Sequence, residues 1–273
     1  MAQFGIQIEP QFGFDYSTLK DLALECESVG FNSMWLSDHL FLDARSQERN
    51  CLDCWTTLAA LAAETTSLRL GSLVTCVSYH YPPILAKMAA TVDVISKGRL
   101  EFGIGAGWNE PECTAMGGDF AHRWTQTKDS IHAMKALWTE DDAEYHGKYY
   151  DFDPMACFPK PSRKPHPPIL LGSIGSPRVY KRVAEWGDGW LPFCTDPQEL
   201  ADGKAEIAKY SAQFGRDPAS LEIALFAPDG MFRTAAELGE MARAGADTAV
   251  LWLRGQDEKE LLAELDELAA AVF

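Results

Sequence analysis

Residues 68–103 read LRLGSLVTCVSYHYPPILAKMAATVDVISKGRLEFG, and this stretch contains the repeating unit from which we infer the fold. Leu68–Val74 and Leu100–Gly103 are predicted strands, because unbroken apolar runs are typical of parallel strands that are buried on both faces. Pro82–Ser96 between them is a predicted helix, since proline suits the first helical turn. The stretch therefore predicts a strand–helix–strand unit with parallel strands.

The same alternation continues through the rest of the chain in both directions. The remaining predicted strands are Phe4–Ile8, Ser33–Ser37, Ile169–Gly172, Gly189–Pro192, Leu221–Phe226 and Thr248–Leu253. The remaining predicted helices lie near Ser17–Val29, Trp55–Thr65, Thr125–Trp138, Pro177–Trp186, Pro197–Phe214, Thr234–Ala244 and Glu258–Val272, with Gly30 and Gly245 as helix stops. Strict alternation predicts an α/β fold, a single (β/α)8 TIM-barrel domain over residues 1–273. A doubly wound open sheet is the alternative.

Two connections are too long to be simple links between a strand and a helix. One follows the fourth strand, from Gly105 to about Arg123, at the barrel end where catalytic residues lie. The other is an insertion before the fifth strand, from about Glu140 to Pro168. It includes a predicted hairpin at Tyr145–Tyr150 and a proline-rich, extended second half. We expect the insertion on the opposite, stability-related side of the barrel unless it folds back over the rim.

Composition and charge exclude several classes of protein. The 273 residues carry 24 Lys and Arg against 40 Asp and Glu, a formal net charge of −16. A surface this negative repels phosphate backbones, so we expect a small-molecule substrate and no nucleic-acid partner. The seven cysteines include one Cys-x-x-Cys pair without a second, which predicts neither a disulfide framework nor a zinc site. Without a membrane-length apolar run or a signal-peptide pattern, we expect a soluble, cytoplasmic protein with no membrane partner.

The second predicted strand runs directly into Asp38 and His39, at the mouth of the expected barrel. A histidine there can transfer protons near neutral pH, and an adjacent acid can set its tautomer or contact a ligand. The alternative is a hydrogen-bonded structural pair. His80, after the third strand, could join both residues in a metal site, but no further ligand is clearly placed to complete it, and we predict no metal.

The fourth strand leads into a Gly-x-Gly-x-Gly run that includes Gly105, Ala106 and Gly107. Such a run lets the backbone approach a flat or phosphorylated ligand closely, although the spacing is not that of a dinucleotide fingerprint. Glu110 and Glu112 follow the run. Each could protonate a ligand or simply face solvent.

The fifth strand leads into Gly172, Ser173, Ile174 and Gly175, just before a predicted helix. Free N–H groups at a helix start, with small residues that admit a ligand, favour phosphate binding. Basic neighbours could add to the attraction: Arg178, Lys181 and Arg182. The alternative is an ordinary turn and helix cap.

Together these stretches resemble the luciferase-like family of barrel oxidoreductases. The resembling segments are Phe4–Ile6, Trp35–His39, Leu68–Thr75, Ala86–Asp93, Gly98–Glu101, Gly103–Trp108, Pro168–Ser173 and Gly187–Trp190. They cover most of the chain and are densest from residue 30 to residue 118. Within the family, Trp35–His39 and the Gly-Ala-Gly-Trp stretch resemble the branch that uses coenzyme F420, a 5-deazaflavin with a phosphate and an oligoglutamate tail.

The resemblance implies where this coenzyme would lie. Its ring would lie against the end of the third strand at Leu73 and Val74, where the family often carries a non-proline cis peptide. The Gly105–Gly107 turn would share this site, and the phosphate would lie at Gly172–Gly175. Asp38 and His39 would flank the ring, with His39 as the proton donor or acceptor.

The chain also departs from the branch members that oxidise sugar phosphates or secondary alcohols. Those carry a tryptophan shortly after the Asp-His pair and a glutamate directly after the glycine-rich run. Here Asp43 and Trp108 occupy these places. Glu110 is near enough to replace that glutamate, which makes it a candidate catalytic residue. The departures leave the substrate unidentified.

The sequence thus predicts a coenzyme F420-dependent oxidoreductase that transfers hydride between the deazaflavin and a small organic substrate, with His39 moving the accompanying proton. The first alternative is an FMN-dependent luciferase-like monooxygenase, because the two coenzymes share ring shape and phosphate. The second is a non-catalytic flavin-binding protein. By analogy with the family we expect a homodimer.

Overall fold

The computed structural model describes residues 3–41, 49–194, 196–228 and 230–273. The barrel strands are β1 (Gln3–Ile8), β2 (Ser33–Leu36), β3 (Arg69–Cys76), β4 (Leu100–Gly105), β7 (Ile169–Gly172), β8 (Gly189–Leu191), β9 (Glu222–Ala227) and β10 (Thr248–Trp252). All neighbours pair in parallel, and the barrel closes because β1 pairs with both β2 and β10. The predicted (β/α)8 TIM barrel is confirmed, and the open-sheet alternative is wrong.

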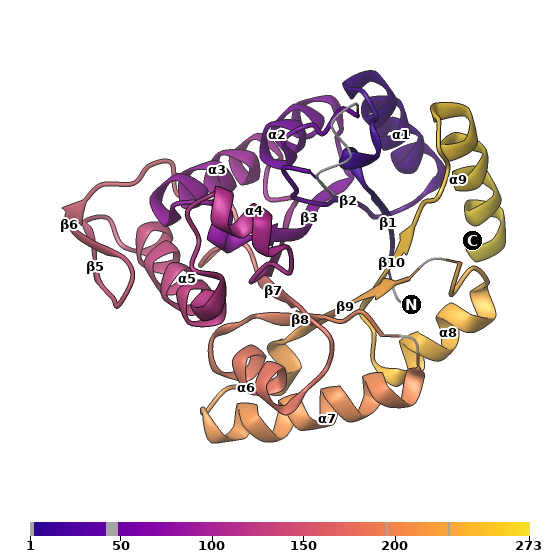
Figure 1. Cartoon of the computed structure of the whole chain (residues 1–273). Coiled ribbons are helices and arrows are strands. Elements are labelled where there is room, and N and C mark those ends of the chain that lie inside the picture. Colours follow the sequence, from indigo (N-terminus) through magenta and orange to yellow (C-terminus); the bar gives the residue numbers. More distant parts are fainter. Residues whose placement is uncertain (1–2, 42–48, 195, 229) are drawn as a thin grey trace.

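Helices surround this ring of strands (Figure 1). They are α1 (Tyr16–Val29), α2 (Cys54–Glu64), α3 (Pro82–Ile95), α5 (Arg123–Thr139), α6 (Pro177–Trp186), α7 (Pro197–Gln213), α8 (Ala235–Ala244) and α9 (Glu258–Val272). Local chemistry sets their ends. The Asp15 side chain caps the start of α1, and Gly30 and Gly245 end α1 and α8 with φ values of 101° and 116°, a left-handed conformation that glycine adopts without a steric penalty.

The barrel interior is filled with side chains and is not a pore. Its buried cluster comprises Trp35, Leu170, Leu191, Ala224 and Val250. The indole of Trp35 fits there because its neighbour on β3 is Gly71, where an added Cβ would lie 2.3 Å from the ring. A filled interior leaves the two ends of the barrel for binding.

Both long connections contain structure of their own. The loop after β4 includes a short helix, α4 (Glu110–Ala115), which the sequence did not predict. The insertion before β7 contains the predicted hairpin, formed by antiparallel β5 (Ala143–His146) and β6 (Asp151–Met155), which projects from the barrel at the left of Figure 1.

The proline-rich half of the insertion runs under the barrel, on the side opposite the mouth. The Arg163 N–H donates to Asp93 Oδ2 at 2.9 Å, and the Arg163 guanidinium donates to the carbonyl of Leu100, the first residue of β4, at 3.0 Å. The expectation that this segment serves the stability-related end is therefore confirmed. No helix in the described part of the chain has the length and apolar character needed to span a bilayer.

Candidate active site

A cavity of about 540 Å³ opens at the carboxyl ends of the strands. The predicted site residues that line it are Asp38, His39, Leu73, Val74, Gly105, Ala106, Gly107, Gly172, Ser173 and Ile174. The structure thus brings four predicted segments, from β2, β3, β4 and β7, around one cavity. Two predicted residues, Gly175 and Glu110, are not part of its lining.

Leu73 and Val74, in the second half of β3, line the cavity and pack against the barrel interior below it, so they form its floor. A non-proline cis peptide joins them, at the position that the family resemblance implied. Glycines on β4, the neighbouring strand, and on β7, the strand beyond it, make room for Val74. A Cβ added at Gly172 would lie 2.5 Å from Val74 Cγ1, and one added at Gly105 would lie 2.8 Å from Val74 Cγ2. The floor is therefore apolar and bordered by bare backbone, an arrangement that suits a planar ligand.

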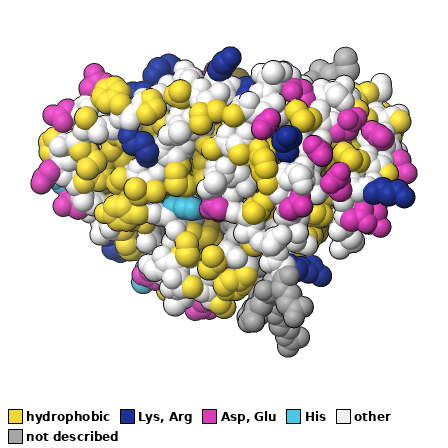
Figure 2. Space-filling model, turned by 90° about the horizontal axis from the view of Figure 1, so that it is seen from above, with side chains coloured by type: hydrophobic (Ala, Val, Ile, Leu, Met, Phe, Trp, Pro, Cys, Tyr) yellow, Lys and Arg dark blue, Asp and Glu magenta, His cyan; other side chains and the backbone are white. Residues whose placement is uncertain are grey.

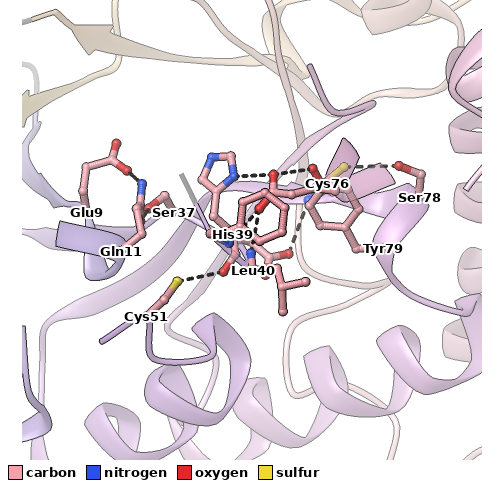
Figure 3. Close-up of polar contacts among 12 residues, drawn as sticks. Glu9, Gln11, Ser37, His39, Leu40, Cys51, Cys76, Ser78 and Tyr79 are labelled. Atoms are coloured by element: carbon pink, nitrogen blue, oxygen red, sulfur yellow. Dashed lines mark hydrogen bonds and ion pairs between the residues drawn. The ribbon is translucent and has the colours of Figure 1, made fainter. Parts of the chain in front are cut away.

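His39 is held in place by a buried glutamate (Figure 3). His39 Nδ1 lies 2.9 Å from Oε2 of Glu112, a residue with no exposed surface. The hydroxyl of Tyr79 donates to the same oxygen at 2.8 Å. The backbone N–H groups of Leu40 and Phe41 donate to Glu112 Oε1 at 2.8 and 3.0 Å. Four donors therefore converge on one carboxylate and tie the loop after β2 to α4.

These donors determine the charge of Glu112 and, through it, the tautomer of His39. Burial raises the pKa of Glu112, but the N–H of Phe41 and the His39 side chain outweigh burial and bring the pKa below its ordinary value. An ionised carboxylate only accepts hydrogen bonds, so His39 Nδ1 carries the hydrogen. His39 Nε2 has no partner among the described residues and is free to exchange a proton with a ligand.

Glu112 was one of two acids that followed the glycine-rich run, and the sequence favoured the other. Glu110 has an exposed side chain on the first turn of α4. Each residue of a helix is rotated by about 100° from the one before it, so residues two apart point in nearly opposite directions. Glu112 faces His39, and Glu110, on the same short helix, therefore points away from it. The sequence could have indicated this difference only if α4 had been predicted.

Asp38 makes a second pair with a histidine beside the first. Its Oδ2 lies 2.8 Å from His80 Nε2 and accepts from the Cys76 N–H at 3.3 Å. Burial lowers the pKa of His80, but the hydrogen bond to Asp38 and its charge outweigh burial and raise the pKa above its ordinary value. Asp38 thus joins the end of β2 to the loop after β3. In the described ranges, no three His, Cys, Asp or Glu side chains are grouped to hold a metal ion.

The segment after β7 offers backbone donors to the cavity. The N–H of Ser173 donates to the Leu191 carbonyl at 3.2 Å, whereas those of Ile174 and Gly175 have no backbone acceptor among the described residues. Ser176 caps α6 by accepting from the Val179 N–H. Two donors therefore stay free beside a helix start, where an anion is favoured.

Positive charge at the cavity comes from a residue that the sequence analysis did not single out. Arg123, at the start of α5, is the sole Lys or Arg among the described lining residues. Its neighbour Trp124 also lines the cavity and stacks under the Arg182 guanidinium at 4.2 Å. Arg178 and Lys181 have exposed side chains outside the lining. Only the fold reveals Arg123, since α5 lies far from β7 in sequence.

Trp108 stands at the rim, and its ring centroid lies 5.7 Å from that of His39. It occupies the place where some relatives carry a glutamate. Asp43, in the place of their tryptophan, lies outside the described residues.

Residues 2–271 match the family model described as luciferase-like monooxygenase. The chain belongs to this family. An uncharacterized protein of Mycobacterium tuberculosis is 33% identical over 189 residues, which cover 64% of this chain and 66% of that protein. The F420-dependent hydroxymycolic acid dehydrogenase of the same organism is 30% identical over 228 residues, 81% of this chain and 61% of that protein. The pyrimidine monooxygenase RutA of Allorhizobium ampelinum is 29% identical over 231 residues, which cover 81% of this chain and 62% of that protein.

These matches span less than two thirds of each relative's own length. Among solved structures, the monooxygenase RslO1 of Streptomyces bottropensis superposes with a TM-score of 0.80 at 21% identity, covering 99% of this chain and 98% of that one. An F420-dependent secondary alcohol dehydrogenase, in complex with an F420–acetone adduct, superposes with a TM-score of 0.81 at 20% identity. The superposition covers 100% of this chain and 99% of that one. Identities this low establish the shared fold alone.

Proposed function

We propose that this protein is a coenzyme F420-dependent oxidoreductase that exchanges hydride with a small organic substrate, with His39 as the acid–base residue. One observation carries the proposal: His39 is oriented by Glu112, has no partner for Nε2 among the described residues, and shares a cavity with the floor at Leu73 and Val74. The 30% identity to an F420-dependent dehydrogenase supports this choice of coenzyme.

The cavity fits a tailed deazaflavin in shape and charge. Its volume lies within the range of about 300–1,000 Å³ that is usual for small-molecule sites. Leu73 and Val74 would hold the ring, and any side chain on Gly105 or Gly172 would intrude on this floor. The free N–H groups after β7 and the Arg123 guanidinium would hold the anionic part, in a protein whose formal charge is otherwise −16.

The chain's own residues would control the proton and the geometry. The deazaflavin supplies hydride chemistry, as a nicotinamide does. His39 Nε2 would give or take the proton at the substrate. Glu112 would hold the productive tautomer and stabilise the imidazolium, and Asp38, paired with His80, would fix the wall beside the ring. In this assignment Glu112, and not Glu110, serves the site.

An FMN-dependent monooxygenase is the second candidate function. The 29% identity to a pyrimidine monooxygenase favours it, and the same apolar floor and anion donors would accept an isoalloxazine ring with its phosphate. The two functions differ in the coenzyme bound and in the use of oxygen.

Titration of the purified protein with oxidised coenzyme F420 and with FMN separates these functions. We expect tighter binding of F420, and in the His39→Ala variant a loss of turnover far larger than the loss of coenzyme affinity. His146→Ala is the matched control, since His146 is exposed and pairs with Asp151 in the β5–β6 hairpin, which does not line the cavity. Preferential FMN binding with oxygen consumption would overturn the proposal. Coenzyme binding without any effect of His39→Ala on a turnover-linked signal would favour a non-catalytic flavin-binding protein.

We also propose that two copies of the chain pair through the flank that carries α3. Figure 2 shows hydrophobic side chains over the left and centre of this flank and acidic ones toward the right. Tyr81 and Ile84 are each 58% exposed there, and Phe158 is 54% exposed. Apolar patches of this kind mark association surfaces. Light scattering should give twice the 30.2 kDa chain mass, and Ile84→Glu should give monomers; a monomeric wild type would contradict the pairing.

A further inference from the structure

Three large apolar side chains stand exposed around the mouth of the cavity. Trp108 is 65% exposed, Ile174 is 66% exposed and Phe193 is 45% exposed, yet all three line the cavity. They come from the loops after β4, β7 and β8. Single exposed apolar residues are ordinary on protein surfaces, but several that line one cavity indicate a binding site. We call these three residues the collar.

The collar lies beyond the floor of the cavity. Trp108 is three residues past the end of β4, and Ile174 and Phe193 are two residues past the ends of β7 and β8. The floor, in contrast, lies within β3, because Leu73 and Val74 come before the last residue of that strand. A planar coenzyme on the floor would therefore leave the collar to contact the second reactant, which stacks on the open face of the ring.

The acid–base residue lies at the same level as the collar. The His39 ring packs edge-on against Trp108, with the ring planes at 65° and the centroids 5.7 Å apart. Phe193 is supported from below by Phe226, at a centroid distance of 5.7 Å. A substrate held by the collar would thus bring its polar atom to His39 and its apolar body to Trp108, Ile174 and Phe193.

The charges of the cavity disfavour an anionic substrate. Glu9 and Asp38 line it as carboxylates, and Arg123 is the sole Lys or Arg among the described lining residues. In our assignment Arg123 serves the anionic coenzyme, which leaves no further guanidinium or ammonium group among the described lining residues for a second anion. Beside Glu9 and Asp38, a sugar phosphate or a carboxylate would be desolvated without such a partner in the described lining.

We propose that the substrate is an uncharged, largely apolar alcohol or carbonyl compound whose body is covered by the collar; this rests on the proposed function. In the oxidative direction the carbinol C–H bond breaks, and its electron pair and hydrogen pass as hydride to the oxidised deazaflavin. The O–H proton passes to His39 Nε2, and the C=O bond forms. In the reductive direction the carbonyl carbon gains the hydride and the oxygen gains the proton.

The first test is a substrate series with the reduced coenzyme, followed by coenzyme reoxidation. A homologous series of alkyl ketones should gain about 3- to 4-fold in kcat/KM per added methylene, until the collar is filled. The matching ketone that ends in a carboxylate should lose at least about 10-fold. Preference for the carboxylate, or no dependence on chain length, would overturn the substrate class while leaving the coenzyme assignment intact.

The second test uses collar variants and a binding readout. Trp108→Ala and Phe193→Ala should each raise KM for the longest ketone about 10-fold and change the dissociation constant of coenzyme F420 by less than about 2-fold. Phe214→Ala is the matched control, an exposed phenylalanine at the end of α7 outside the cavity. An equal loss of coenzyme affinity would assign the collar to the coenzyme and overturn the inference.

The fluorescence of bound coenzyme F420 gives a third readout that needs no turnover. Apolar ketones should change the fluorescence of the bound coenzyme in the wild type. The collar variants should need about 10-fold higher ketone concentrations for the same change. Absence of any perturbation by apolar ketones would refute the substrate class. If coenzyme F420 itself does not bind, it is the proposed function that fails.

Discussion

Replacement of Glu112 by glutamine tests the origin of the His39 tautomer. Glu112 Oε1 accepts from the two backbone N–H groups of Leu40 and Phe41, and Oε2 accepts from Tyr79 and His39. A glutamine can keep both backbone bonds with its remaining oxygen. Its NH2 group must instead donate toward His39 Nδ1, which forces the hydrogen of the imidazole onto Nε2. The neutral ring then cannot accept a proton from a ligand.

The structure sets the size of both effects. The two backbone hydrogen bonds become neutral ones, and the bonds to His39 and Tyr79 must reverse their direction. These changes should lower the free energy of unfolding by about 2 kcal/mol and the Tm by roughly 4–8 °C. Turnover should fall by about 10²–10⁴-fold, the usual contribution of general acid–base catalysis. Coenzyme affinity should change little, because Glu112 does not line the cavity.

The assay compares steady-state turnover, the dissociation constant of coenzyme F420 and thermal unfolding of Glu112→Gln with those of Glu110→Gln. The control removes a neighbouring exposed charge from the same helix and should match the wild type. Because folding lowers the pKa of Glu112, its contribution to stability is present above the ordinary glutamate pKa and is lost as the pH falls through the folded value. The difference in Tm between Glu112→Gln and the wild type should therefore disappear at acidic pH. Turnover of Glu112→Gln within 3-fold of wild type would refute the reasoning.

Three further predictions concern other residues. Gly172→Ala should weaken coenzyme F420 binding at least about 10-fold in a fluorescence titration, because the new Cβ would lie 2.5 Å from Val74 Cγ1; unchanged affinity would place the ring elsewhere. Pairing with Asp38 raises the pKa of His80 despite burial, which lowers it. The stabilisation by this pair is therefore present below pH 6.5 and is lost as the pH rises through the pKa of His80 in the folded protein. His80→Gln should therefore lower the Tm at pH 6 and have a smaller effect at pH 9, whereas a pH-independent loss would argue against a charged pair. Burial raises the pKa of Glu27, but donors in the turn before β3 outweigh it and lower the pKa to about 2. Glu27→Gln should thus lower the free energy of unfolding by about 1 kcal/mol at pH 7, and in denaturant titrations this difference from the wild type should narrow between pH 4 and pH 2. A difference that does not depend on pH would contradict this account.

The fold could be predicted because its signals are local. Strands buried on both faces read as continuous apolar runs, and side chains such as Asp15 and residues such as Gly30 mark helix ends within one turn of chain. The cavity followed from the fold, since the carboxyl ends of barrel strands converge whatever the loops contain.

What the sequence could not give depends on contacts between distant segments. The six residues of α4 are too few to show a helical period, so the orientations of Glu110 and Glu112 were not apparent. Arg123 reaches the cavity from the helix that follows a long loop, and no local pattern distinguishes it from other surface arginines. The pairing of Asp38 with His80 likewise needs two loops to meet.

Val74 and the two glycines that border it have a consequence for anyone who redesigns this protein. The methyl groups of Val74 occupy the space that side chains at positions 105 and 172 would need, so a side chain at either position requires a smaller residue at position 74. Random mutagenesis, which alters one position at a time, would rarely produce the two changes together. A library meant to accept another coenzyme should pair a smaller residue at position 74 with alanine at position 105 or 172, or vary the loops and leave this triplet untouched.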